Sequence, residues 1–308
     1  MMNSMLGALE SGLLYAFMAL GVYITFRILD FPDLTVDGSF TTGGAIAAVM
    51  ITNGYSPWLA TLCALLGGAL AGMCTGLLHT KGKINGLLSG ILMMIALYSI
   101  NLRILGKPNV SLMGEDTLLS PINLLVVMPF VVILVKLLMD VFLRTDLGLA
   151  LRATGDNARM IRSFGVNTDT TTVLGISLSN GLVALSGALI AQDTSFADSS
   201  MGIGMIVLGL ASVIIGEAIF GAGSVFRATL AVVLGSIVYR IVVALALRAP
   251  GMEASDLKLI TAIIVIIALL FPSIQRYVKQ KKTARKRSAE LAEQAIARKR
   301  GGTANVKA

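Results

Sequence analysis

Nine apolar segments are the feature that most constrains how this chain can fold. They run over roughly 6–29, 34–52, 58–78, 86–105, 121–143, 171–191, 203–221, 224–247 and 256–274. A membrane-spanning helix needs about 20 consecutive apolar residues, and most of these segments are near that length. Only 14% of the 308 residues are charged, against about 25% in a typical soluble protein. The sequence therefore excludes an ordinary soluble enzyme and predicts an all-α, polytopic membrane bundle of about eight to nine spans.

The second segment departs from the others because it is rich in polar residues and glycine. Asp33 and Asp37 stand at its start, and Gly43-Gly44 lies near its middle. Broken helices and re-entrant segments occur at membrane depth where protein or water covers the backbone. We therefore expect this segment to be broken or re-entrant.

The basic residues are concentrated at the C-terminus. Residues 275–308 hold 11 Lys and Arg against two Glu, whereas the rest of the chain is close to neutral. This distribution argues against nucleic-acid binding and divides the chain into a transmembrane domain, 1–275, and a basic tail, 276–308. By the positive-inside rule the tail is cytoplasmic, where it can also contact anionic lipids. Nine spans would then place the N-terminus outside, and a re-entrant second segment would reverse that end.

The known catalytic and nucleotide-binding motifs are missing from the sequence. It contains no G-x-x-x-x-G-K-[ST], H-E-x-x-H, G-x-S-x-G or C-x-x-C. The single His79 has no Cys or carboxylate neighbours that would complete a metal site. We therefore predict no catalytic residue, no metal and no cofactor, and expect any ATP hydrolysis to come from another chain.

A long polar segment, 147–168, separates the fifth apolar segment from the sixth. Asp156 or Asn157 is suited to cap a short helix that Gly165 would end. That helix would carry a small apolar face made of Met160, Ile161 and Phe164. The segment is either a docking site for another protein or a solvated loop with positive-inside arginines.

Polar residues gather at the start of the second apolar segment. The cluster consists of Asp33, Thr35, Asp37, Ser39, Thr41 and Thr42, followed by Gly43 and Gly44. Such residues can line a translocation path, or they can form an ordinary capped helix start with Asp37 or Ser39 as the N-cap. A similar polar run at 198–204 also leads into an apolar segment, which is a faint sign of an internal repeat.

Ionisable residues within the apolar segments are further candidates, because charge at membrane depth is costly. Tyr98 and Asn101 are three residues apart and are expected to share a helix face, where with Arg103 they could contact an amino acid. Alternatively, Arg103 reaches out to the membrane interface.

Other charged residues have predicted partners. Lys136 and Asp140 are expected to pair at a spacing of four residues, and Glu217 is expected to pair with Arg227. Arg240 has no predicted role.

Several motifs resemble one family of transport proteins. The run Arg152-Ala153-x-Gly155-Asp156-Asn157…Gly165 is similar to the cytoplasmic coupling segment of permeases of the branched-chain-amino-acid class of ABC importers. The stretches 10–16, 19–25 and 213–221 resemble the same family, and the resemblance covers about 5–275. Two further stretches, 31–40 and 96–104, are closest to a tryptophan/tyrosine-type subgroup that works with a lipoprotein binding protein.

The resemblance implies a bacterial cell-membrane permease with a helical bundle like that of the vitamin-B12-type importers. It further implies a second permease copy in a homodimer, two ABC ATPase subunits, and an external lipoprotein that delivers a small organic solute such as tryptophan or tyrosine. The implied ATPase-coupling residues are Arg152, Ala153, Gly155, Asp156, Asn157, Arg159 and Gly165. The rivals are a self-sufficient secondary transporter or channel and an intramembrane enzyme, although no clustered catalytic site is visible for the latter.

Overall fold

The computed structural model describes residues 2–120 and 124–247, together with positions 259, 261–266, 270 and 281. Most of the predicted last span and of the basic tail therefore lies outside the described residues. The chain divides into two units, 1–265 and 266–308. Only the first is described in detail below.

The described part of the chain is built from helices and one short β-ribbon. The elements are α1 (Met2–Val22), η1 (Tyr23–Ile28, a π-helical turn), α2 (Thr35–Thr52), α3 (Pro57–Thr80), α4 (Gly86–Leu105), β1 (Asn109–Ser111), α5 (Leu124–Phe142), α6 (Asp146–Ser163), α7 (Thr168–Asp193), β2 (Phe196–Asp198), α8 (Met205–Phe220) and α9 (Val225–Ala246). The two strands pair antiparallel, with Val110 opposite Ala197. The predicted all-α class is thus confirmed for the described residues apart from this ribbon.

Six helical segments among the described residues are long and apolar enough to cross a membrane. They are Met5–Ile28, Pro57–Thr80, Gly86–Leu105, Leu124–Phe142, Thr168–Asp193 and Val225–Ala246. Helix α8 is apolar but shorter, and α2 is not among the six. The total of eight to nine spans stays a prediction.

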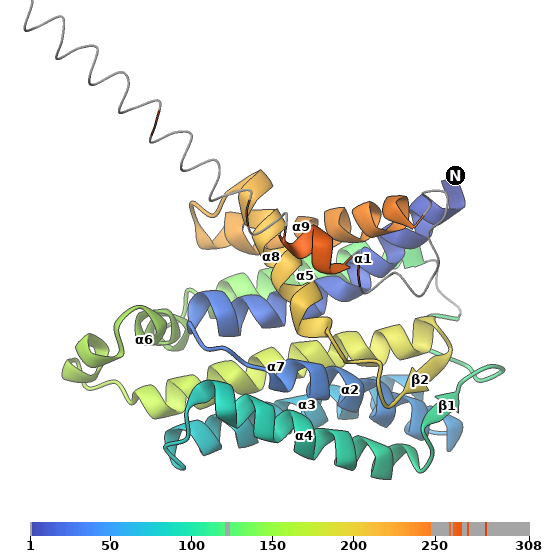
Figure 1. The fold of residues 1–308 in the computed structure, drawn as a ribbon, viewed down its shortest axis with the longest axis horizontal. Coiled ribbons are helices and arrows are strands. Elements are labelled where there is room, and N and C mark those ends of the chain that lie inside the picture. Colours follow the sequence, from blue (N-terminus) through green and yellow to red (C-terminus); the bar gives the residue numbers. More distant parts are fainter. Residues whose placement is uncertain are drawn as a thin grey trace, which may run out of the picture. The chain divides into compact units, whose positions relative to one another are not determined.

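The helices of residues 1–265 form two groups joined by α1 (Figure 1). Helices α2, α3, α4 and α7 pack together, and α1, α5, α8 and α9 form the other group. Helix α1 contacts both α7 and α9, so it lies where the two groups meet. Helix α6 lies at one end of these helices and the β1–β2 ribbon at the other (Figure 1). We call these the α6 end and the ribbon end.

Helix α2 is continuous, so the predicted break or re-entrant turn at Gly43-Gly44 is wrong. A Cβ on Gly43 would lie 1.9 Å from the carbonyl oxygen of Ala184, and one on Gly187 would lie 2.0 Å from that of Phe40. The glycines therefore allow the backbones of α2 and α7 to touch, the usual role of small residues between membrane helices. Most of α2 is buried by its neighbours, which explains how a polar helix is accommodated in an apolar chain.

Candidate functional site

Helix α6, the predicted coupling segment, consists of two short helical pieces joined by a kink at Asn157. The backbone there leaves the helical region, with φ −154° and ψ 88°. The Asn157 side chain accepts a hydrogen bond of 3.0 Å from the backbone N–H of Met160, and so caps the second piece. Gly165, with φ +84°, follows the end of that piece. The sequence correctly predicted both the cap and the stop.

The first piece of α6 is held against the rest of the chain. A Cβ on Gly155 would lie 1.9 Å from the carbonyl oxygen of Ile28, so only glycine lets α6 approach the end of η1 this closely. The hydroxyls of Thr154 and Thr171 are 2.9 Å apart, which ties α6 to α7. Gly155 therefore lets α6 pack against the rest of the chain and does not contribute to the outer surface of α6.

The second piece of α6 presents an apolar and basic surface. Phe164 is 72% exposed and Met160 57% exposed, and Arg159 is exposed beside them. Ile161 is half-buried, so it adds little to this surface. The predicted apolar face therefore exposes two large side chains, those of Met160 and Phe164. Exposed apolar side chains flanked by charge are typical of a protein-binding surface.

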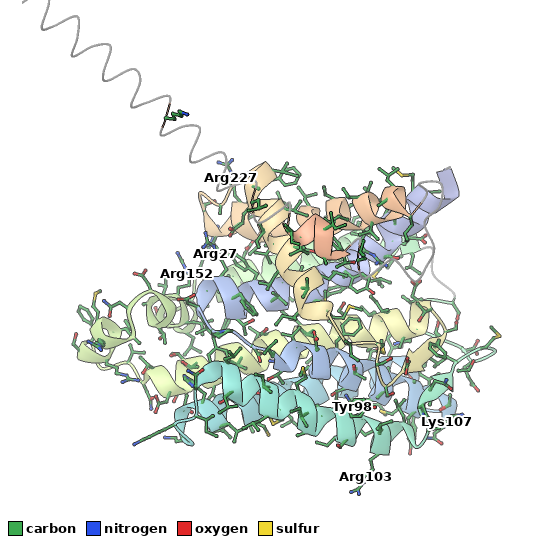
Figure 2. All side chains as sticks on the ribbon, viewed as in Figure 1. Arg27, Tyr98, Arg103, Lys107, Arg152 and Arg227 are labelled. Carbon is green, nitrogen blue, oxygen red and sulfur yellow. The ribbon has the colours of Figure 1, made fainter. Side chains whose placement is uncertain are left out.

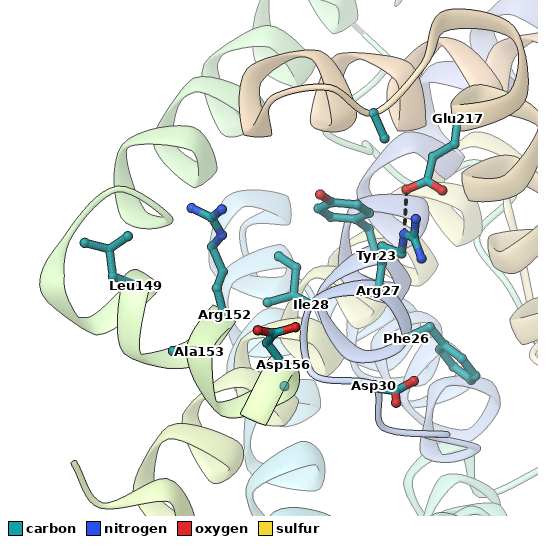
Figure 3. A pocket seen from close by; sticks show the side chains of 12 residues that line it. Tyr23, Phe26, Arg27, Ile28, Asp30, Leu149, Arg152, Ala153, Asp156 and Glu217 are labelled. Atoms are coloured by element: carbon teal, nitrogen blue, oxygen red, sulfur yellow. Dashed lines mark hydrogen bonds and ion pairs between the residues drawn. The ribbon is translucent and has the colours of Figure 1, made fainter. Parts of the chain in front are cut away.

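A polar cavity of about 770 Å³ opens between η1, α6 and the end of α8 (Figure 3). Its lining residues are Tyr23, Phe26, Arg27, Ile28, Asp30, Leu149, Arg152, Ala153, Gly155, Asp156, Glu217 and Ala222. Arg27 Nε donates to Glu217 Oε1 at 2.9 Å across this cavity. Arg152 lines it without a hydrogen bond or ion pair to any other described residue, and is thus available to a partner.

The predicted partner of Glu217 is wrong. Arg27, far away in the sequence, pairs with Glu217 because the end of η1 lies beside the end of α8. Arg227 instead donates to the carbonyl oxygen of Phe220 at 3.5 Å, at the C-terminus of α8. No local pattern in the sequence indicates the contact between Arg27 and Glu217, because that contact depends on tertiary packing alone.

The predicted pair of Lys136 and Asp140 is confirmed, and both side chains are buried. The hydroxyl of Thr229 in α9 donates to Asp140 Oδ1 at 2.6 Å, and Lys136 Nζ lies 3.1 Å from the centroid of the Phe226 ring. This cluster joins α5 to α9.

Asp33 is fully buried and fixes the start of α2. It accepts hydrogen bonds from the backbone N–H of Thr35 at 2.9 Å and from Asn180 Nδ2 at 2.7 Å. Burial raises the pKa of the Asp33 carboxyl above its ordinary value, although these hydrogen bonds oppose the shift. In this conformation Asp33 joins α2 to α7 and is not exposed to a path.

Asp37 caps α8 rather than its own helix. Its two carboxylate oxygens accept from the backbone N–H groups of Gly204 at 2.9 Å and Ile206 at 2.8 Å. Thr41, one turn along α2, accepts from the backbone N–H of Gly202 at 3.0 Å. The two polar runs that suggested an internal repeat are therefore in direct contact. Neither Asp37 nor Ser39 makes a side-chain cap on α2.

The rest of the α2 cluster is also buried. Ser39 and Thr42 are almost inaccessible, and Thr42 donates to the carbonyl oxygen of Gly38 at 2.9 Å. A Cβ on Gly44 would lie 2.6 Å from the sulfur of Met201. These residues hold α2 against its neighbours in the described structure.

The three candidates on α4 separate onto two faces. Asn101 is fully buried and donates to the carbonyl oxygen of Gly38 at 3.1 Å, whereas Tyr98 is 50% exposed. Arg103 is exposed and points away from the other helices (Figure 2). Tyr98 and Asn101 are neighbours on the helix, about 60° apart around its axis as expected, but the edge of the buried face falls between them.

Comparisons with known proteins agree with this architecture. Residues 4–270 match the family described as branched-chain amino acid transport system / permease component. The chain is 48% identical over 272 residues to the tyrosine transport system permease protein of Clostridioides difficile (strain R20291), covering 87% of this chain and 91% of that protein. It is also 36% identical over 279 residues to an uncharacterized protein of Rickettsia prowazekii (strain Madrid E), covering 87% and 97%.

A solved structure shares the fold. A chain of PsaBC from Streptococcus pneumoniae, solved in complex with Fab, matches with a TM-score of 0.54 at 15% sequence identity. The match covers 89% of this chain and 94% of that one. Together, the family match, the sequence relatives and the set of apolar helices show that this chain is a multi-pass membrane protein, the permease of an ABC transporter, and belongs to the branched-chain amino acid transport system permease family.

Proposed function

We propose that two copies of this chain form the membrane channel of an importer for aromatic amino acids. Two ATPase subunits dock on α6, and a lipoprotein delivers the solute from the other side of the membrane. The observation that carries the proposal is the construction of α6. Its outer piece exposes Met160 and Phe164, while its inner piece is fixed to the bundle through Gly155.

The contacts around the cavity form a mechanical connection from α6 into the membrane helices. Gly155 touches η1 at Ile28, and the neighbouring Arg27 binds Glu217 near the end of α8. The other end of α8 is capped by Asp37 of α2. A displacement of α6 by ATP-bound subunits would therefore reach α8 and α2 through direct contacts.

The α4 helix is proposed to face the translocation path between the two copies. Tyr98 and Arg103 are both exposed but lie about 140° apart around the helix, so each is proposed to contact the solute separately, the ring of Tyr98 by stacking and the guanidinium of Arg103 by charge. Asn101 lies behind them, and the buried α2 cluster then supports the wall of the path rather than lining it. The relative named as a tyrosine transport permease supports this substrate class.

The orientation follows from the distribution of charge over the two ends. The α6 end carries Arg27, Lys81, Lys83, Arg144, Arg152, Arg159, Arg162 and Arg227. The loops at the ribbon end carry Lys107 alongside the acidic residues Glu115, Asp116 and Asp198. By the positive-inside rule the α6 end is cytoplasmic. The proposed orientation has the N-terminus outside and the C-terminal tail inside the bacterial inner membrane.

The test is co-purification from mild detergent followed by uptake into proteoliposomes. The tagged chain is expected to bring down an ATPase and an external binding protein, and the reconstituted complex to take up radiolabelled tyrosine or tryptophan with internal ATP. Recovery of the chain alone in folded form, with uptake that needs no ATPase, would instead establish a secondary transporter or channel.

Arg152→Glu is expected to abolish ATPase association without affecting membrane insertion, because it places a negative charge where the unpaired guanidinium now lies. Lys83→Glu makes the same charge change at the α6 end but outside α6, and is expected to retain the ATPase. Equal recovery of the ATPase with both variants would contradict the docking assignment.

A further inference from the structure

An apolar crevice of about 240 Å³ opens between α3 and α5. Its floor is buried and consists of Phe17 of α1, Met128 of α5 and Leu189 of α7. Its mouth is exposed, with Trp58 and Leu62 of α3 on the rim. The other lining residues are Thr61, Leu65, Leu118, Val127, Val131 and Leu185. The crevice lies on the seam between the two helix groups, because α5 packs against α1 and α9 whereas α3 packs against α2, α4 and α7.

The interior of the crevice offers no hydrogen bond to a ligand. Thr61 supplies the one hydroxyl of its lining, and that group is already bonded. It donates to the carbonyl oxygen of Pro57 at 2.8 Å and accepts from Gln192 Nε2 at 2.9 Å. The indole N–H of Trp58 lies at the exposed mouth, and the remaining lining side chains are apolar. A ligand that enters must therefore be apolar, since a polar group would lose its hydrogen bonds there.

The crevice is continuous with the surface that this membrane protein presents to lipid. Both flanking helices carry exposed apolar side chains, which are Leu62, Leu66 and Leu70 on α3 and Phe130, Ile133 and Leu134 on α5. Trp58 is 71% exposed and Tyr55 is 56% exposed, and both lie where α3 begins, beside the ribbon. Tryptophan and tyrosine are typical of the level of the lipid head groups. The crevice therefore runs from the membrane interface into the hydrocarbon layer.

The size of the crevice excludes a helix as its occupant. From Trp58 to Leu65 it follows α3 over about 10 Å, at a rise of 1.5 Å per residue. A helix about 10 Å wide would occupy roughly 800 Å³ over that length, several times the volume present. The last apolar segment of the chain packs elsewhere, because Thr261 interacts with Tyr239 of α9. A single hydrocarbon chain is much thinner than a helix and fits.

We infer that this crevice binds one acyl chain of a membrane phospholipid, with the head group beside Trp58. The acyl chain contacts α3 and α7 of one helix group and α1 and α5 of the other, so the lipid becomes part of the seam between them. Bulk lipid is as apolar as the crevice, so the lipid is retained by close contact on several sides rather than by the hydrophobic effect. The site needs neither solute nor ATPase, and so goes beyond the proposed function.

Trp58 is the single tryptophan of the chain, so its fluorescence reports on the crevice without further labelling. The probe is phosphatidylcholine with bromine atoms on its acyl chains, because bromine quenches tryptophan fluorescence on contact. It is titrated onto the full-length chain in detergent micelles after native lipid has been removed. We expect quenching that saturates at one lipid per chain and persists when the micelles are diluted with detergent. Lipid that only shares the micelle quenches in proportion to its fraction, without a plateau.

Two variants fill the crevice from opposite walls, so the test survives if one of them fails to fold. Val131→Phe on α5 and Leu65→Phe on α3 enlarge half-buried lining residues. Each is expected to weaken the saturable binding by about tenfold or more, the effect of overfilling a packed site. Val141→Phe makes the same change on α5 at a side chain that is 63% exposed and outside the crevice. This control is expected to bind the lipid as wild type does.

Native mass spectrometry of the same samples counts the lipid directly. Wild type is expected to retain the mass of one phospholipid, and both filled variants are expected to lose it. The inference is overturned if quenching in wild type only follows the lipid fraction, or if the filled variants bind as tightly as wild type. It is also overturned if saturable quenching appears only after a dimer of the chain has dissociated, because a second copy then covers the crevice. No solute, ATPase or ATP is present, so failure of the proposed importer function would leave these results unchanged.

Discussion

The carboxylate of Asp37 in α2 accepts a hydrogen bond of 2.8 Å from the backbone N–H of Ile206, and so caps a helix that begins 169 residues later in the chain. The other carboxylate oxygen accepts from Gly204. The first turn of α8 thus depends on a side chain from α2, and the two helices cannot separate at this point without exposing unsatisfied N–H groups.

Removal of this cap is expected to destabilise the protein and weaken transport. Asp37→Ala should lower the free energy of unfolding by about 1–2 kcal/mol, the usual range for a lost N-cap. Asp37→Asn keeps one acceptor oxygen and should cost less. Thermal unfolding in detergent micelles gives the comparison, and equal unfolding temperatures for Asp37→Ala and wild type would show that the cap does not contribute.

The ion pair between Arg27 and Glu217 is expected to matter for coupling more than for stability. The Arg27 side chain is 58% exposed, so the pair contributes about 1 kcal/mol or less to folding. Glu217→Arg should therefore fold but transport poorly, because like charges would push η1 away from α8. The exchange Arg27→Glu/Glu217→Arg should restore part of the uptake, and failure of this rescue would argue against a direct link.

The buried pair of Lys136 and Asp140 is expected to matter for stability more than for coupling. Lys136→Ala leaves a buried carboxylate whose remaining described hydrogen bond comes from Thr229, and should cost about 3–5 kcal/mol. The double variant Lys136→Met/Asp140→Leu removes both charges and should be less harmful than the single change. The yield of monodisperse protein after detergent extraction measures the difference.

Gly155 is expected to be sensitive to a single methyl group. Gly155→Ala would place a carbon 1.9 Å from the Ile28 carbonyl oxygen, so α6 must shift at a cost of about 1–3 kcal/mol. The exposed residues Met160 and Phe164 are unchanged, so ATPase binding should persist while ATP hydrolysis no longer drives uptake. Gly165→Ala is the matched control. An added Cβ at Gly165 meets no atom within 4 Å, but the positive φ there is unfavourable for alanine, so this change should affect only the end of α6.

Local features of the candidate site were predictable from the sequence because they depend on neighbouring residues. Apolar length indicated the membrane helices, the residues around Asn157 and Gly165 indicated a capped and terminated helix, and a spacing of four residues indicated the pair of Lys136 and Asp140. Each of these rests on helix geometry over one or two turns. The family resemblance was readable for the same reason, since it is carried by short continuous motifs.

Only the tertiary structure decided what the polar residues of α2 contact. Asp37 was predicted to cap α2 or line a path, and Gly43 to break the helix, yet Asp37 caps α8 and Gly43 touches α7. Arg27 pairs with Glu217, and Arg240 lies over the ring of Tyr15. No local sequence pattern indicated either contact. A side chain three to four residues away is fixed by helix geometry, whereas a partner more than a hundred residues away is fixed by how the helices pack. The sequence by itself determined which segments are helical and apolar, and packing determined which of their charges meet.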